Sequence, residues 1–206
     1  MSDLELLDVF DEQGVRLGVR TRADVHREGL WHRCLHLWIV TEEGDVLLQR
    51  RARTKAAWPD MLDATAAGHL TAGEAVLDGL REAEEELGLA FSPAQVRLLG
   101  VRAVADRPVP GTVNREFQHV HVARSPLPLD GWTGLDRAEV DGLVALPLPA
   151  FTALVHSGVP QSARLWDGVR VTSRPVGVQQ LVPSPYLTVL AVMLERFAAG
   201  LGPLAL

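Results

Sequence analysis

Two pairs of apolar runs near the start of the chain each flank a polar turn that contains glycine, which is the pattern of a β-hairpin. The pairs are residues 4–10 with 15–20, and residues 35–40 with 46–50. Three further runs of apolar and β-branched residues predict strands: 96–105, 116–123 and 140–146.

Helical periodicity predicts three helices in the rest of the pattern. They cover residues 74–87, residues 147–156 with Pro147 at the start, and residues 185–199 with Pro185 in the first turn. The pattern of apolar and polar residues therefore predicts a mixture of strands and helices, and we expect an α/β fold.

Three segments lack either period and are expected to be loops. They are the Pro/Gly-rich residues 107–114, residues 125–137, and residues 159–183 with a small hairpin at 166–171. None of them marks a strong domain boundary. We therefore expect residues 1–206 to form one domain.

Carboxylates gather on one face of the helix predicted at 74–87. At about 100° per residue, Glu82, Glu85 and Glu86 share this face. Asp78 lies one turn before them, and apolar residues collect on roughly the opposite side: Val76, Leu77, Leu80, Ala83 and Leu87. Like charges four residues apart repel each other, so two interpretations stay open: a solvated acidic surface, or a site for a divalent cation.

The order of residues around these acids resembles the Nudix box. Gly68, five residues and Glu74 are followed by Arg81-Glu82-Ala83-x-Glu85-Glu86-x-Gly88-Leu89, so the box spans 68–89. Six residues separate Glu74 from Arg81, where the family pattern has seven. The shorter spacing leaves the position of Glu74 relative to the other acids open.

Flanking residues extend the resemblance toward one Nudix branch, that of the type I isopentenyl diphosphate isomerases and their hydrolase-like relatives. The similar segments are 31–38, 44–51, Thr54-Lys55 and Trp58-Pro59, and the likeness covers roughly residues 4–195. It implies a Nudix α/β/α sandwich with a mixed sheet. We expect it to carry an N-terminal β-hairpin at about 4–20 and a C-terminal helix at about 185–199.

The resemblance also implies the chemistry of the box. Glu82, Glu85, Glu86 and the carbonyl of Gly68 are the expected ligands of Mg²⁺, or of Mn²⁺. Arg81 is expected to orient a box carboxylate, with a simple ion pair to Glu85 as the alternative.

Three carboxylates are candidates for the general base that activates water: Glu85 first, then Glu116 and Glu139. Glu116 begins a predicted strand and Glu139 precedes one. Both have an ordinary alternative as surface carboxylates.

Cationic and aromatic residues after the second predicted hairpin are candidates for substrate contacts. Arg50, Arg53 and Lys55 could meet phosphate oxygens, and Trp58 could stack on a base or ring. The alternatives are solubility residues for the cations and a core or rim position for the tryptophan.

Histidines form a second candidate set: His26, His32, His36 and His69. His32, His69 and Glu116 match ligand positions of the isomerase relatives, but alanines stand at 66 and 67 where a catalytic cysteine is expected, and Asn114 replaces a glutamate. An isomerase must move protons on and off carbon, so the missing thiol argues against isomerisation. Packed or hydrogen-bonded histidines are the alternative for His36 and His69.

Composition narrows the range of functions. The net charge is −6, which argues against a general binder of nucleic acid polymers. The single cysteine, Cys34, permits no intrachain disulfide and fits a reducing cytoplasm. No apolar run reaches membrane-spanning length, and the acidic start lacks the basic residues of a signal peptide.

The sequence thus predicts a cytoplasmic, Mg²⁺-dependent Nudix hydrolase acting on a nucleoside diphosphate derivative or a related organic diphosphate. Two alternatives remain: an isopentenyl diphosphate isomerase-like enzyme, and a Nudix module that binds a nucleotide without cleaving it. The substrate is not encoded in any recognisable motif. The N-terminal hairpin and the last helix suit either a monomer or a homodimer.

Overall fold

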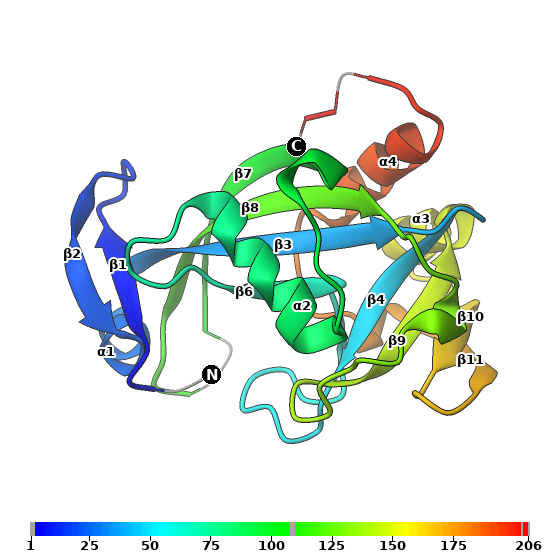
Figure 1. The fold of residues 1–206 in the computed structure, drawn as a ribbon, viewed down its shortest axis with the longest axis horizontal. Coiled ribbons are helices and arrows are strands. Elements are labelled where there is room, and N and C mark those ends of the chain that lie inside the picture. Colours follow the sequence, from blue (N-terminus) through cyan, green and yellow to red (C-terminus); the bar gives the residue numbers. More distant parts are fainter. Residues whose placement is uncertain (1–2, 108–109, 203, 206) are drawn as a thin grey trace.

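A computed structural model describes residues 3–107, 110–202, 204 and 205. Its described strands form one mixed sheet with helices on both faces (Figure 1). The strands are β1 (Leu6–Phe10), β2 (Arg16–Thr21), β3 (Trp31–Val40), β4 (Asp45–Arg51), β5 (Leu62–Asp63), β6 (Ala66–His69), β7 (Val96–Asp106), β8 (Asn114–Arg124), β9 (Val140–Pro147), β10 (Gln161–Trp166) and β11 (Val171–Val176). The helices are α1 (Arg22–Glu28), α2 (Arg81–Leu87), α3 (Leu148–Ser157), α4 (Leu187–Ala198) and the 3₁₀ turns η1 (Val76–Leu80), η2 (Pro93–Gln95), η3 (Leu129–Gly131) and η4 (Val178–Gln180).

Strand β3 is the centre of the sheet. It pairs in parallel with β8 along its whole length, from Trp31 opposite Arg115 to Val40 opposite Arg124. On its other side it pairs antiparallel with β6 and, at its end, with β4. Strands β4, β9, β10 and β11 then continue the sheet in antiparallel order.

The two faces of β3 enter different cores because successive side chains of a strand point in opposite directions. Leu35 and Leu37 pack toward α2, together with Ala83 and Leu87 of that helix. Trp38 packs on the other face in the core that also contains residues of α3 and α4. In Figure 1, α2 lies in front of β3 and β6, with α3 and α4 on the far side, so the layers are helix, sheet, helix.

Most predicted elements are confirmed. Both predicted hairpins, the strands at 96–105, 116–123 and 140–146, and the last two helices are present, with bounds that shift by a few residues. The loop expected at 125–137 contains only a 3₁₀ turn. Part of the loop expected at 107–114, residues 108–109, lies outside the described residues.

Two predictions are wrong. The segment 159–183 is not mainly a loop, because β10 and β11 pair from Gln161 opposite Val176 to Trp166 opposite Val171. The hairpin expected at 166–171 is therefore only the turn of a longer one. The helix predicted at 74–87 is not continuous either, since a 3₁₀ turn, η1, precedes the α-helical segment α2.

The 3₁₀ turn accommodates the short spacing between Glu74 and Arg81. A 3₁₀ helix rises about 2.0 Å per residue against about 1.5 Å for an α-helix, so fewer residues cover the same length. The 3₁₀ turn comes closest to the neighbouring chain at Gly79, where a Cβ would stand 2.6 Å from Leu70 Cδ2 and 3.1 Å from Leu35 Cβ of β3. The result is that Glu74 still reaches Arg81, with 2.7 Å between Glu74 Oε1 and Arg81 Nε.

The prediction that Glu82, Glu85 and Glu86 share one face of the helix is also only partly correct. Glu82 and Glu86 are 2% and 4% exposed and lie between α2 and the sheet, whereas the side chain of Glu85 is 59% exposed. Leu77, expected on the packed side, is 37% exposed because the 3₁₀ turn changes its direction. The acids therefore divide into a buried pair and an exposed neighbour.

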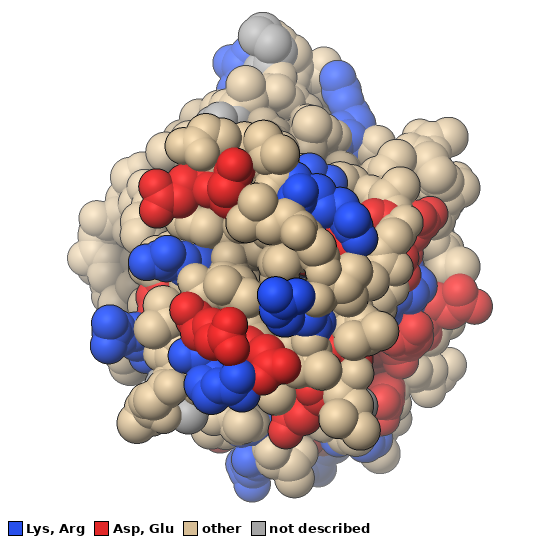
Figure 2. Space-filling model, turned by 90° about the vertical axis from the view of Figure 1, so that its left-hand side faces the viewer, with Lys and Arg blue, Asp and Glu red and all other residues tan. Residues whose placement is uncertain are grey.

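The surface on the side of the N-terminal hairpin carries cations and anions mixed together, without a broad basic area (Figure 2). Within the described part of the chain, no helix is both long enough and apolar enough to cross a membrane.

Candidate active site

The buried acids lie along the free edge of β6, a short strand that pairs only with β3 among the described residues. Glu82 and Glu86 are one turn apart on α2, and both turn toward this edge. Gly68 makes the approach possible, because a Cβ at this position would stand 2.1 Å from Glu82 Cδ. We call the region formed by Glu82, Glu86 and the backbone of residues 67–69 the acid edge.

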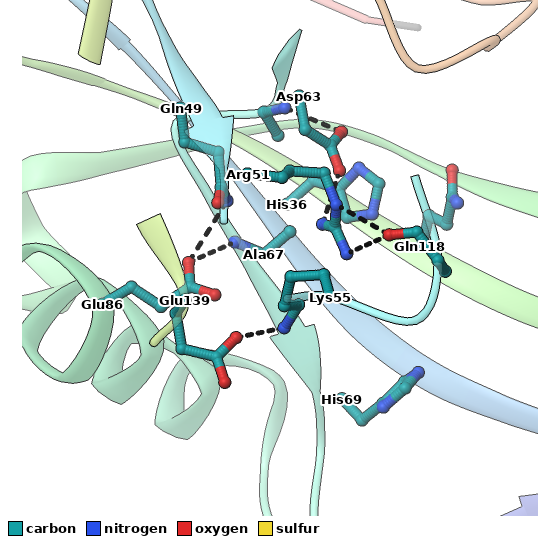
Figure 3. Close-up of polar contacts among 12 residues, drawn as sticks. His36, Gln49, Arg51, Lys55, Asp63, Ala67, His69, Glu86, Gln118 and Glu139 are labelled. Atoms are coloured by element: carbon teal, nitrogen blue, oxygen red, sulfur yellow. Dashed lines mark hydrogen bonds and ion pairs between the residues drawn. The ribbon is translucent and has the colours of Figure 1, made fainter. Parts of the chain in front are cut away.

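Two donors hold Glu86 in place (Figure 3). Its Oε2 accepts from the backbone N–H of Ala67 at 3.4 Å and from Gln49 Nε2 at 3.3 Å. The sheet register explains the first contact. Leu70 N donates to Arg33 O across β6 and β3, so the backbone groups of Gly68, two residues earlier, also point to β3, and those of Ala67 point to the free edge.

Burial changes the acidity of both carboxyls. Burial raises the pKa of Glu86 to about 8, with a further contribution from the charge of Glu82. Burial also raises the pKa of Glu82 to about 7, although the nearby Arg81 guanidinium opposes the shift. Two ionised carboxylates at this edge lack sufficient positive charge from the protein itself.

Arg81 connects the acids to one another. Its guanidinium donates to Glu74 Oε1, to Glu82 Oε1 at 2.7 Å and to Glu85 Oε2 at 3.2 Å. It also donates to the carbonyl oxygen of His69 at 3.0 Å. One arginine thus fixes the start of α2 against β6 and orients three of the carboxylates around it.

Lys55 and Glu139 form an ion pair beside Glu86 (Figure 3). They come from the β4–β5 connection and from the segment before β9. The backbone of the two segments is joined by the bond from Ala52 N to Glu139 O at 2.9 Å. Both charges act electrostatically on Glu86.

A second cluster lies on the opposite face of β3 and β6 from α2, and we call it the histidine pocket. Its centre is Glu116 of β8, whose Oε1 lies 3.4 Å from His69 Nε2 and 3.8 Å from His32 Nε2. Two groups of side chains in this region have ligand atoms within 4.8 Å of one another and could hold a metal ion: His26, His32 and His69, and Cys34, His36 and Glu116.

The hydrogen bonds of the histidine pocket leave one ring nitrogen without a partner. His32 Nδ1 contacts Leu30 O at 3.0 Å, and the fully buried Nε2 has no hydrogen-bond partner within the described residues. Burial opposes ionisation of Glu116, but the hydrogen bond from His69 holds the pKa of this carboxyl well below its usual range. Gln118 Nε2 also donates to it at 2.8 Å.

The structure brings together some predicted site residues and not others. Gly68, Glu74, Arg81, Glu82, Glu85, Glu86 and the Lys55–Glu139 pair all lie around the acid edge, and Glu116 and His69 lie in the histidine pocket. Arg50 and Arg53 instead contact Asp60. Trp58 sits in a left-handed backbone conformation with φ of 51°.

Sequence reasoning missed Gln49, Ala67 and Gln118, which donate hydrogen bonds to the buried carboxylates Glu86 and Glu116. Gln49 had a signal in the sequence, because it is a polar residue directly after an apolar run. In the structure its side chain is 1% exposed. Ala67 acts through its backbone, which no residue pattern reveals.

The residues of the acid edge fit a hard divalent cation. The pair of buried carboxylates has raised pKa values, and the cleared space at Gly68 lies beside them. Carboxylate and carbonyl oxygens are the ligands that Mg²⁺ and Mn²⁺ prefer. The expected carbonyl ligand Gly68 is directed to β3, so the carbonyl that faces the edge belongs to Ala67.

Comparisons with known proteins identify a matching family and several relatives of the chain. The profile of the NUDIX domain matches residues 30–165. An uncharacterized Nudix hydrolase of Clostridium acetobutylicum is 35% identical over 147 residues, which cover 70% of each chain. Nudix hydrolase 3 of Arabidopsis thaliana is 35% identical over 149 residues, which cover 69% of this chain but 19% of that protein.

An isopentenyl-diphosphate Delta-isomerase of Cutibacterium acnes is 35% identical over 126 residues, covering 58% of this chain and 62% of the isomerase. Among solved structures, the Deinococcus radiodurans protein DR0079 aligns with 93% of this chain and 100% of its own, with a TM-score of 0.60 and 20% identity. A NUDIX hydrolase from Alicyclobacillus acidocaldarius aligns with 83% of this chain and 97% of its own, with a TM-score of 0.52 and 15% identity. At these identities, the two structures support the fold alone.

Proposed function

The chain belongs to the NUDIX domain family of hydrolases, and on this premise we propose that it is a Mg²⁺-dependent enzyme that cleaves the diphosphate linkage of a nucleoside diphosphate derivative or a related organic diphosphate. The observation that carries the proposal is the acid edge. Glu82 and Glu86 are almost fully buried, side by side, with raised pKa values, and they need a cation from outside the chain.

Glu82, Glu86 and the carbonyl of Ala67 would hold Mg²⁺, or Mn²⁺, with Glu85 at the exposed rim. When bound, the ion would neutralise part of the diphosphate charge and lower the pKa of a water molecule. Gly68 contributes space rather than its carbonyl.

The remaining residues position these ligands. Arg81 orients Glu82 and Glu85 and ties them to Glu74 and to β6. Gln49 and the Ala67 N–H fix one oxygen of Glu86 and leave its other oxygen to face the site. Lys55, the cation beside Glu86, is the expected partner of phosphate oxygens.

The two alternatives have less support. For isomerisation, Ala66 and Ala67 supply no thiol, and burial raises the pKa of the Cys34 thiol, which is 2% exposed. A binding module without turnover was suggested by the shortened box, but the 3₁₀ turn preserves the contact between Glu74 and Arg81.

A substrate panel tests the proposal. The purified protein is assayed for release of phosphate or a monophosphate from organic diphosphates, with Mg²⁺, with Mn²⁺ and with a chelator. Activity that needs the metal and is lost in Glu86→Gln, while Glu84→Gln behaves as wild type, supports it. Glu84 is the matched control because it is exposed on the same helix. Tight binding with no turnover of any substrate under either metal would support the binding module instead.

A further inference from the structure

Lys55 is the only lysine in a chain that carries 19 arginines as its other cationic side chains. It lies at the acid edge, and its ammonium group contacts Glu139 Oε2. A guanidinium is suited to fixed, planar, two-point contacts, whereas an ammonium is a compact charge on a flexible stem that can change partners. The one position where the chain uses lysine is therefore a position suited to exchange.

Glu139 is held on a firm support. Asp136 N donates to the carbonyl of Glu86 at 2.9 Å, and Glu139 N donates to Asp136 O at 3.0 Å. Gly134 packs directly on Gly88, the residue that ends α2, where a Cβ on Gly88 would stand 2.6 Å from Gly134 Cα. The segment before β9 is thus attached to the same helix that carries Glu82 and Glu86.

The pair is partly withdrawn from water, with 18% and 19% of the two side chains exposed. In Figure 3 the Glu139 carboxylate lies beside Glu86 and the Lys55 ammonium lies beside Glu139, and both members of the pair act electrostatically on Glu86. A diphosphate arriving at this edge brings more negative charge than one carboxylate. It is therefore a stronger partner for Lys55 than Glu139 is.

We propose that Lys55 is an exchangeable counter-ion, which holds Glu139 in the free protein and moves to the diphosphate on binding, so that the released Glu139 serves as the general base. The inference rests on the proposed hydrolase function. The Glu139 carboxylate takes a proton from water while the water oxygen forms a bond to phosphorus. The bridging P–O bond breaks with its electron pair on the leaving phosphate oxygen, and Glu139 later returns its proton to solvent.

The single lysine allows a direct measurement of the exchange. Reductive methylation with ¹³C-formaldehyde keeps the charge and labels Lys55 as the only lysine, with the α-amino group resolved separately by its own chemical shift. We expect the dimethyl-lysine NMR signal of the free protein to move on addition of methylenediphosphonate and Mg²⁺. We expect it to move also in Glu139→Gln without any ligand. A lysine signal that stays unchanged while calorimetry shows bound methylenediphosphonate would overturn the proposal.

Variants separate binding from catalysis. Glu139→Gln removes the competitor for Lys55, so we expect it to bind methylenediphosphonate about 2- to 10-fold more tightly. The same change lowers kcat by about 10²- to 10⁴-fold through loss of the base. In a Lys55→Met background, which binds more weakly, Glu139→Gln has no such tightening effect.

Controls keep the test specific. Glu139→Asp is expected to recover part of kcat, and Asp130→Asn, an exposed carboxylate of the same connection, to behave as wild type. A Glu139→Gln enzyme with kcat within threefold of wild type would refute the base assignment and leave the hydrolase proposal intact. An inactive wild type with every substrate and metal would refute the hydrolase proposal, while the NMR titration still reports on the exchange.

Discussion

The acid edge and the histidine pocket both contain buried glutamates, and the two regions lie on opposite faces of β3 and β6. At the acid edge, burial raises the pKa values of Glu82 and Glu86, and the charge of Glu82 adds to the rise for Glu86. In the histidine pocket, Glu116 accepts hydrogen bonds from His69 and Gln118, and its pKa falls. The same type of side chain thus meets opposite electrostatic surroundings on the two faces of the same strands.

The difference indicates which region depends on something outside the chain. Glu116 has a low pKa because partners within the protein stabilise its charge. The acid pair has Arg81 beside Glu82 and Lys55 near Glu86, but Lys55 is already paired with Glu139, and the pKa values of both acids remain raised. Neutralising an acid of the acid edge should therefore lower activity but stabilise the metal-free protein. Neutralising Glu116 should instead destabilise the protein.

The largest expected effect is the loss of activity in Glu86→Gln. Removing one of the two buried carboxylates that we propose as metal ligands should lower kcat/KM by on the order of 10²- to 10³-fold, since charge stabilisation at the reacting phosphoryl group would depend on the ion. The measurement is the initial rate at saturating Mg²⁺. A rate within a factor of three of wild type would exclude Glu86 as a ligand.

Stability should change in the other direction in the same variant. In the presence of a chelator, Glu86→Gln should be more stable than wild type at pH 8 by on the order of 2 kcal/mol, because the amide carries no charge to bury. Glu116→Gln should instead lose about 1–3 kcal/mol, since it disturbs a satisfied buried network. Urea unfolding of both variants tests this reversal of sign, and two destabilised variants would break the comparison.

The pH dependence of the metal-free protein should reflect the acid edge. A carboxyl with a raised folded-state pKa stabilises the fold below its unfolded pKa and loses that contribution as the pH rises to the folded value. The buried His32, with its pKa lowered from 6.5 to about 4, adds dependence only below pH 6.5. Between pH 6.5 and about 8, where Glu86 titrates, the free energy of unfolding should therefore fall, by on the order of 2 kcal/mol.

Saturating Mg²⁺ should abolish most of that fall, because the cation replaces the protons on the acids. Thermal unfolding at several pH values, with Mg²⁺ and with chelator, measures the difference. A flat profile for the metal-free protein would show that the acid pair is compensated in some other way.

The smallest effect is expected for Glu85→Gln. Its side chain is 59% exposed and its contact with Arg81 is an i, i+4 pair at 3.2 Å, so stability should change by no more than about 0.5 kcal/mol. The loss of activity should be clearly smaller than in Glu86→Gln. Equal losses in the two variants would place Glu85 on the metal as firmly as Glu86.

Local patterns predicted the strands and helices that bury one regular face, and residue order predicted the acids of α2. They could not predict β5 and β6, which are two and four residues long and owe their conformation to pairing with β4 and β3. They also missed the 3₁₀ turn at Val76–Leu80, because an apolar period of three to four residues does not distinguish the two helix types.

The residues of the candidate site divide in the same way, into those predictable from local sequence and those that depend on contacts between distant segments. Glu82 and Glu86 were predictable because they lie in one helix, whereas the neighbourhood of Glu139 depends on contacts between segments far apart in the chain. The burial of the acids was not predictable from the helix alone, because it results from the absence of a side chain at Gly68 on another element.

The parallel pairing of β3 with β8 also bears on the order in which the two regions form during folding. The acid edge is made by β3, β6 and α2, which follow one another closely along the chain. The histidine pocket forms only after His32 on β3 has paired with Glu116 on β8, which is far from it in the sequence, and such distant contacts are slow to form. We therefore expect amide protection from hydrogen exchange to appear in β6 and α2 before it appears in the β8 amides that bond to β3, rather than in those that bond to the adjacent strand β7.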